Sequence, residues 1–127
     1  MPSPSETVCA FLARWEKPGD LYAAFDDYFT PETVWENVGW ATTVGADEAN
    51  ALNRGYEEAL GMTAIRVENL AVAEVGNKVL TERIDHIIGK DGEAMISPHV
   101  MGIFEVEDGR ITAWRDYFDT RTYAPPE

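Results

Sequence analysis

Hydrophobic residues recur at helical spacing in the first half of the chain and at alternate positions in the second half. Residues 3–17 carry apolar side chains three and four positions apart, after serines that can cap a helix, which predicts a first helix. The sequence "KPGD" ends this helix, and residues 20–29 repeat the helical spacing in a short second one. Residues 45–61 predict a third helix that ends at Gly61.

The rest of the chain has the pattern of extended structure. Residues 30–40 combine a proline at a turn with β-prone residues, and alternation dominates from residue 63 onwards. The turn sequences "GNK", "GKDGE" and "EDGR" divide that second region into strands. The strands are predicted at residues 63–75, 78–88, 94–106 and 110–123, and residues 124–127 are expected to lack regular structure.

Helices followed by an antiparallel meander predict an α+β fold. Three N-terminal helices should pack on one face of a curved mixed, mainly antiparallel sheet. With 127 residues and no repeat or linker, the chain is expected to form a single domain, residues 1–127. Such a cone-shaped domain encloses a deep apolar pocket, which suits a small apolar ligand.

Charge and cysteine content exclude several classes of partner. The formal net charge of −13 repels phosphate backbones and anionic lipids, so we expect no nucleic-acid or membrane partner. Cys9 is the single cysteine, and His86 and His99 lack helical ligand spacing, so no metal site is expected. The sequence "MPSPSETV" does not resemble a signal peptide, and no apolar run approaches a membrane span. We therefore expect a cytoplasmic protein.

Two strand segments carry charged residues on faces that should be buried. In "TERIDHIIG", Arg83 and Asp85 are two positions apart and so share a face. In "ITAWRDYFD", Asp116 shares its face with Trp114 and Phe118. Each charge by itself could belong to an exposed or structural ion pair. Carboxylates among large apolar side chains, however, must be paired, protonated or reactive.

An arginine between two carboxylates makes a plausible acid–base device. The planar guanidinium can bind both acids at once and stays charged. If one carboxyl is ionised and the other protonated, the site holds a base and an acid at the same pH. The base can activate water while the acid protonates a leaving oxygen, which would open a strained ether without metal or covalent intermediate.

These residues carry a resemblance to a known family. The sequences "TERID", "GIFEVEDGRITAWRDYFD" and "TVWENV" resemble limonene-1,2-epoxide hydrolases of the nuclear-transport-factor-2-like, or SnoaL-like, superfamily. The resemblance implies that fold and a cofactor-independent hydrolysis of an apolar epoxide to a vicinal diol. The substrate implied is cyclic, terpene-like or larger.

The resemblance also implies roles for individual residues. Asp116 would be the base that deprotonates water, Asp85 the acid that protonates the epoxide oxygen, and Arg83 the group that holds them together. Asn37 would position the water. Trp35 stands where the family has a tyrosine that helps to fix the water; an indole there could donate to the water or simply fill the pocket.

Other side chains are expected to contact the substrate. The predicted substrate-binding residues are Trp35, Trp114, Pro98, Val100 and Phe118. By alternation, His86 and His99 should instead lie on the outer face of the sheet. Met101 and Ile103 would leave that face partly apolar, and relatives of this fold pair through it, so the resemblance implies a homodimer.

Two alternatives remain open at this stage. The chain could be a ketosteroid-isomerase-like or polyketide-cyclase-like enzyme, although these need a carboxylate base near the first strand, where this chain has Asn37. It could also be a non-catalytic binder of apolar ligands, because one fold hosts many functions. A binder, however, gains little from buried charges.

Overall fold

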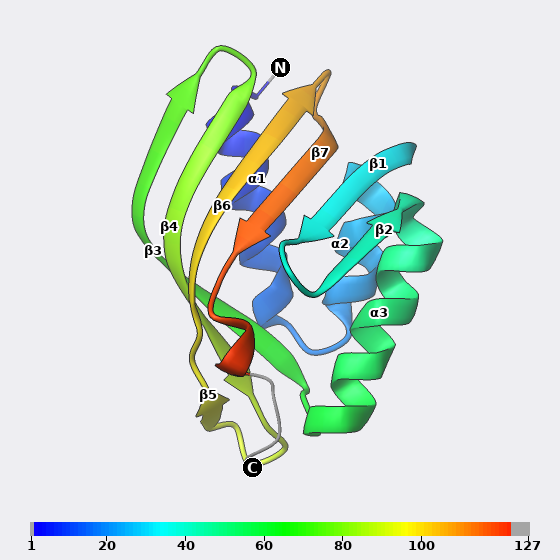
Figure 1. Ribbon diagram of the computed structural model, residues 1–127, viewed down its shortest axis with the longest axis vertical. Helices are drawn as coiled ribbons and strands as arrows, with labels where there is room; N and C mark the ends of the chain where they lie inside the picture. The colour runs from blue at the N-terminus through cyan, green and yellow to red at the C-terminus, as the bar shows by residue number, and fades with distance from the viewer. Residues whose placement is uncertain (1, 123–127) are drawn as a thin grey trace.

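Three α-helices lie against one curved sheet in the computed structural model, which describes residues 2–122 (Figure 1). The helices are α1 (Pro4–Ala13), α2 (Asp20–Tyr28) and α3 (Gly45–Leu60). A 3-10 turn, η1 (Arg14–Glu16), extends α1. These elements confirm the three predicted helices, and the predicted tail at residues 124–127 lies outside the described residues.

The sheet is mixed and mainly antiparallel, as expected. Its strands are β1 (Phe29–Asn37), β2 (Ala41–Val44), β3 (Ala64–Val75), β4 (Lys78–Ile88), β5 (Ala94–Ile96), β6 (His99–Glu107) and β7 (Arg110–Tyr117). Their order is β2-β1-β7-β6-β4-β3, with β5 paired to β4. The pair β1 and β7 is parallel, and the other pairs are antiparallel. The first and last strands of the chain therefore lie side by side.

Three predicted strand boundaries were wrong. The predicted strand at 94–106 is two strands, β5 and β6, interrupted at Ser97 and Pro98, because proline has no N–H for a sheet ladder. The predicted extended segment at 30–40 stops at Asn37, and the chain turns back into β2, which was not predicted. The last strand ends at Tyr117, and a 3-10 turn, η2 (Thr120–Thr122), follows it.

Local sequence explains where the helices begin and end. At the start of α1, the Ser3 hydroxyl accepts a hydrogen bond from the Glu6 amide, while the Glu6 carboxylate accepts one from the Ser3 amide. This reciprocal capping box satisfies donors that the helix itself leaves unpaired. At the end of α3, Gly61 adopts a φ of 72°, a left-handed conformation that glycine reaches without steric cost.

An aromatic core fills the space between the helices and the concave face of the sheet. Helix α1 crosses that face at β3, β4 and β6, and α3 flanks β1 and β2 (Figure 1). Trp114 on β7 is fully buried and contacts rings from α1, α2, β1 and β6. The buried rings are those of Phe11, Trp15, Phe25, Phe29, Trp35, Phe104 and Trp114.

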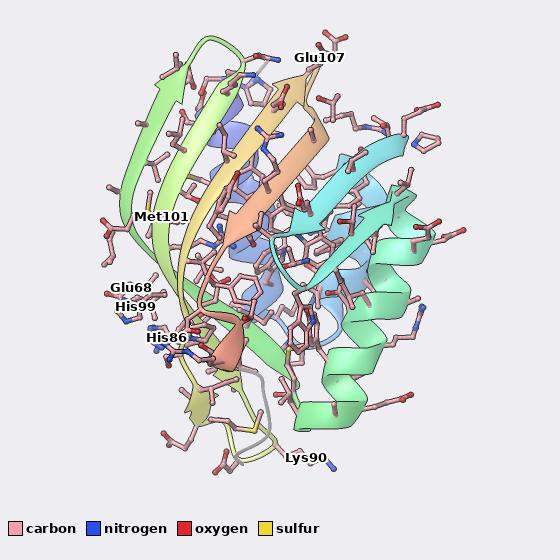
Figure 2. All side chains as sticks on the ribbon, in the orientation of Figure 1. Glu68, His86, Lys90, His99, Met101 and Glu107 are labelled. Atoms are coloured by element: carbon pink, nitrogen blue, oxygen red, sulfur yellow. The ribbon has the colours of Figure 1, made fainter. Side chains whose placement is uncertain are left out.

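The outer face of the sheet carries both polar and apolar side chains. Figure 2 shows Glu68, His86, His99 and Met101 on the side of the sheet away from α3, and His86 bonds Glu68 there at 3.0 Å. Met101 lies opposite Tyr117 in the β6–β7 pairing, and about half of each side chain's surface is exposed. The expected homodimer through this face stays a prediction.

Candidate functional site

A fully buried arginine joins two aspartates on the inner face of the sheet. Arg83 Nε donates to Asp85 Oδ1 at 2.9 Å, and Nη2 donates to Asp85 Oδ2 at 3.2 Å. The same guanidinium donates to Asp116, from Nη1 to Oδ1 at 3.0 Å and from Nη2 to Oδ2 at 2.6 Å. Both carboxylates are thus held by two-armed contacts, which the planar fork of arginine favours. The structure therefore brings together the three charged residues singled out in the sequence.

Strand register places the members of this triad side by side. Thr81 on β4 pairs with Gly102 on β6, and Gly102 pairs with Asp116 on β7, so the three positions form one row across the sheet. Arg83 leans along β4 towards this row, and its Nη1 also donates to Thr81 Oγ1 at 3.1 Å. Gly102 has no side chain to block the guanidinium, so the arginine reaches across β6 to the aspartate on β7.

Burial and neighbouring charges act in opposite directions on the pKa values of Arg83 and Asp116. Burial by itself would lower the pKa of Arg83, but the charges of Asp116 and Asp85 outweigh it and raise that pKa, so the guanidinium stays protonated. Burial raises the pKa of Asp116 above its ordinary value, and the charge of Arg83 opposes that rise without cancelling it. Asp116 is therefore a stronger base than an exposed aspartate when it is ionised.

An aromatic stack fixes the position of Asp116. The indole Nε1 of Trp114 donates to Asp116 Oδ1 at 2.7 Å. The Trp114 ring is stacked between Trp35 and Phe104, with ring centroids 4.7 Å and 4.9 Å away. A carboxylate held by both a stacked indole and a guanidinium has little freedom to rotate. One oxygen position can thus be presented reproducibly to a ligand in the cavity.

Hydrogen-bond donors without a partner lie next to Asp116. Asn37 pairs with Asp116 in the parallel β1–β7 register, and Trp35 pairs with Trp114. Trp35 Nε1 and Asn37 Nδ2 are buried and have no hydrogen-bond partner within the described part of the chain. The indole nitrogen of Trp15 shares this condition. A buried donor without a partner costs roughly 1–3 kcal/mol, so these groups are expected to bind a polar atom in the cavity.

The cavity beside the triad is mainly apolar. It offers about 60 Å³ to water-sized groups, which is room for a few waters, so a larger ligand requires side chains to move. Its polar lining comes from Asn37, Asn53, Tyr56, Asp85 and Asp116. The apolar lining comes from Trp15, Leu21, Phe25, Trp35, Leu60, Met62, Ile65, Ile87, Val100, Trp114 and Phe118.

Most, but not all, of the predicted substrate-contacting residues line this cavity. Trp35, Trp114, Val100 and Phe118 line it, although Phe118 follows the end of β7 rather than belonging to the strand. Pro98 is buried but is not among the lining residues, and its substrate contact stays a prediction. The Pro98 carbonyl accepts a hydrogen bond from the Asp85 amide at 3.0 Å, which supports the strand that carries Asp85.

The helical wall of the cavity was missed from the sequence. Asn53 and Tyr56 on α3 both line the cavity, and they are three residues apart, hence on one face of the helix. Trp15, which belongs to η1, also lines the cavity, whereas the sequence pattern placed it only in the first helix and gave it no place in the site. One feature of the sequence could have revealed this wall. The polar residue Asn53 lies on the apolar face of the third helix, where a solvated residue is not expected.

Comparison with known proteins identifies the family. Residues 2–124 match the family described as the limonene-1,2-epoxide hydrolase catalytic domain. The chain belongs to the limonene-1,2-epoxide hydrolase family. Family membership confirms the resemblance found in the short sequences around Arg83 and Asp116. Among curated proteins, epoxide hydrolase EphG of Mycobacterium tuberculosis is 40% identical over 88 residues, which cover 69% of this chain and 56% of that protein.

Solved structures place this member of the limonene-1,2-epoxide hydrolase family within a wider fold. An M. tuberculosis epoxide hydrolase resembling limonene-1,2-epoxide hydrolase has 32% sequence identity and a TM-score of 0.73, covering 94% of this chain and 84% of its own. A nuclear-transport-factor-2-like protein of unknown function from Burkholderia pseudomallei has 17% identity and a TM-score of 0.75, covering 95% and 94%. The second match shows the fold alone, and it confirms the predicted fold class.

Two further features of the described residues concern metal ions and membranes. No group of three or more His, Cys, Asp or Glu side chains within residues 2–122 is arranged to hold a metal ion. In the same residues, no helix is both long enough and apolar enough to cross a membrane. The expected cytoplasmic location stays a prediction.

Proposed function

We propose that this protein is an epoxide hydrolase that adds water to an apolar epoxide and releases a vicinal diol. The support is its membership of the limonene-1,2-epoxide hydrolase family, together with its similarity to epoxide hydrolase EphG of M. tuberculosis in sequence and to a solved M. tuberculosis epoxide hydrolase in structure. The substrate proposed is a cyclic, terpene-like or larger epoxide, because the cavity wall is mostly aromatic and aliphatic.

One observation carries the mechanism: two residues with unpartnered buried donors, Asn37 and Trp35, line the same cavity as Asp116 from the neighbouring strand. A water beside Asp116 would donate one hydrogen to the carboxylate, and one lone pair of its oxygen would accept a bond from Asn37 Nδ2 or from Trp35 Nε1. The other lone pair of the water would then be available to attack the epoxide carbon. Asp116, whose pKa is raised by burial, accepts the proton as the water attacks.

Asp85 is the proposed complementary acid. It lines the cavity, and Arg83 binds it through the same guanidinium that binds Asp116. In the proposed step, the water oxygen forms a bond to one epoxide carbon, the bond from that carbon to the ring oxygen breaks, and Asp85 gives its proton to that oxygen. Asp116 gains a proton as Asp85 loses one, so a proton must return to Asp85 before the next turnover.

Diol formation by the wild type and by Asp116→Asn tests this proposal. The amide fits the same space but cannot accept the water's proton, so we expect the variant to fold and to lose roughly 10²–10⁴-fold in kcat/KM. The assay uses a panel of cyclic and terpene epoxides, with circular dichroism to confirm folding. Rapid hydrolysis by Asp116→Asn would show that Asp116 is not the base.

Ligand binding without diol formation would favour the alternative of a non-catalytic binder. If the wild type bound apolar ligands across the panel but formed no diol, the protein would be a binder on the same fold, with Trp35 filling the water site. The ketosteroid-isomerase-like alternative gains no support at the first strand, where the cavity is lined by the amide of Asn37.

A further inference from the structure

Three residues that line the cavity carry a buried hydrogen-bond donor without a partner in the described part of the chain. They are Asn37, Trp35 and Trp15. The first two belong to β1, beside the strand of Asp116, and the proposed hydrolysis uses them to bind the water. Trp15 belongs to η1, and its side chain is only 3% exposed. The water-binding role therefore leaves the indole N–H of Trp15 without a function.

The order of the strands separates Trp15 from the donors on β1. In the sheet, β1 is the neighbour of β7, which carries Asp116, whereas β3 is the neighbour of β4, which carries Asp85. The turn η1 packs against β3. The donors of β1 thus belong to the side of the proposed base, and the element that carries Trp15 lies on the side of the proposed acid.

Neighbouring groups hold the Trp15 ring in one orientation. Arg83 Cζ lies 5.9 Å from the ring centroid, within the range of a cation–π contact. The Phe25 ring is stacked against it with centroids 5.9 Å apart, and the Phe11 ring meets it edge-on at 5.3 Å. An indole N–H can only donate. Since the described chain supplies no acceptor for it, the acceptor has to come from a molecule in the cavity that Trp15 lines.

We propose that Trp15 Nε1 donates a hydrogen bond to the epoxide oxygen, the atom that Asp85 protonates. When the bond from carbon to this oxygen breaks, the electron pair stays on the oxygen, which receives the proton of Asp85. Trp15 keeps its own proton throughout. Its hydrogen bond strengthens as negative charge develops on the oxygen, so it lowers the barrier to ring opening. This inference rests on the proposed hydrolase function and adds a second donor at the leaving oxygen.

The first test measures the binding of two ligands that differ by one oxygen, 7-oxabicyclo[2.2.1]heptane and norbornane. Neither contains an epoxide, so binding can be followed by calorimetry without turnover. Trp15→Phe removes the N–H and keeps an aromatic ring. We expect it to lower the ratio of ether affinity to hydrocarbon affinity about 3- to 10-fold relative to the wild type, as loss of one hydrogen bond predicts. Differences in ligand hydration cancel, because the same two ligands are compared in both proteins.

Phe11→Leu is the control for altered packing. Phe11 contacts the Trp15 ring but does not line the cavity, and it carries no hydrogen-bond donor on its side chain. Its replacement should change the affinities for both ligands together and keep the wild-type ratio. A ratio that falls equally in Phe11→Leu and Trp15→Phe would overturn the proposed contact.

The NMR signal of the Trp15 indole N–H provides a test that needs no substituted protein to fold. In the ¹⁵N-labelled wild type, this signal should move downfield when the ether is added and should not do so with norbornane. The same displacement with both ligands would overturn the contact, because a hydrocarbon has no acceptor.

Diol formation from cyclohexene oxide separates this inference from the hydrolase function. We expect kcat/KM to fall about 3- to 10-fold in Trp15→Phe. If the wild type forms the diol but Trp15→Phe keeps the wild-type affinity ratio, the contact is overturned and the hydrolase function stands. If the wild type forms no diol but the ratio and the NMR signal respond as expected, Trp15 binds the ligand oxygen and the hydrolase function fails.

Discussion

Gly102 lies so close to Arg83 that a Cβ atom built on the glycine would sit 2.5 Å from Arg83 Nη1. The same Cβ would sit 2.5 Å from Asp116 Oδ1. The salt bridge between β4 and β7 therefore passes directly over the backbone of β6, and it exists because position 102 has no side chain. The charged triad depends on a glycine that itself carries no chemistry.

Replacing Gly102 by alanine should disrupt the triad. The added methyl must displace Arg83 or Asp116, so we expect a loss of about 1–3 kcal/mol in unfolding free energy. Hydrolysis should fall by a larger factor than this loss of folded protein explains. Urea unfolding and diol formation measure the two effects. Gly55→Ala is the control, because Gly55 is exposed within α3 and a Cβ there meets nothing within 4 Å. Wild-type activity in Gly102→Ala would contradict the proposed importance of the bridge.

Arg83→Lys should separate charge from geometry. Lysine keeps the positive charge but cannot bind two carboxylates with a planar fork, so the aspartates should lose their mutual alignment. We expect roughly 100-fold lower kcat/KM with only a modest decrease in unfolding temperature. Arg115→Lys serves as the control, since Arg115 pairs with Glu105 at 3.0 Å on a partly exposed surface. Equal kinetics for wild type and Arg83→Lys would reduce Arg83 to a structural ion-pair partner.

Substitutions of Trp35 test whether its indole binds the water. Trp35→Phe removes the N–H donor and keeps an aromatic ring, so kcat/KM should fall about 3- to 10-fold, the value of one hydrogen bond. Trp35→Tyr supplies a hydroxyl donor instead and should retain or increase activity on small cyclic epoxides. The measurement is the rate of diol formation by the wild type, Trp35→Phe and Trp35→Tyr. If Trp35→Phe matched the wild type, Trp35 would act only by filling space.

The pH dependence of activity should reflect the buried state of Asp116. Asp116 must be ionised to accept a proton, and burial raises its pKa from the ordinary value of 3.8. As pH is lowered, kcat/KM should therefore begin to fall at a pH above 3.8. A profile that stays level down to the range of exposed aspartates would contradict a buried carboxylate base.

The unfolding free energy should also depend on the ionisation of Asp116, and the direction of that dependence can be predicted. The pKa of Asp116 is higher in the folded than in the unfolded protein, so its contribution to stability is full at low pH and is lost as pH rises through the folded pKa. Asp116→Asn does not titrate at this position. The unfolding free energy of wild type minus that of Asp116→Asn should accordingly decrease as pH rises above 3.8, the ordinary pKa of the carboxyl. An increase over that range would show that Arg83 outweighs burial.

Much of the fold could be predicted from sequence because its signals are local. The capping serine before α1 and the left-handed Gly61 after α3 act on neighbouring residues, so short patterns report them. The extended alternation of residues 78–88 is also local, and it correctly placed Arg83 and Asp85 on one buried face. The boundary errors occurred where one short signal competes with another, as at Pro98 inside an otherwise continuous strand pattern.

The sequence by itself determined the candidate catalytic side chains, since alternation and the family resemblance selected Arg83, Asp85, Asp116 and Asn37. Only the tertiary structure decided how those residues meet. The parallel pairing of β1 with β7 joins segments at opposite ends of the chain and puts Asn37 beside Asp116. The need for glycine at position 102 and the polar wall of α3 arise in the same way. Contacts between distant segments depend on strand order and helix packing, which no local pattern of residues encodes.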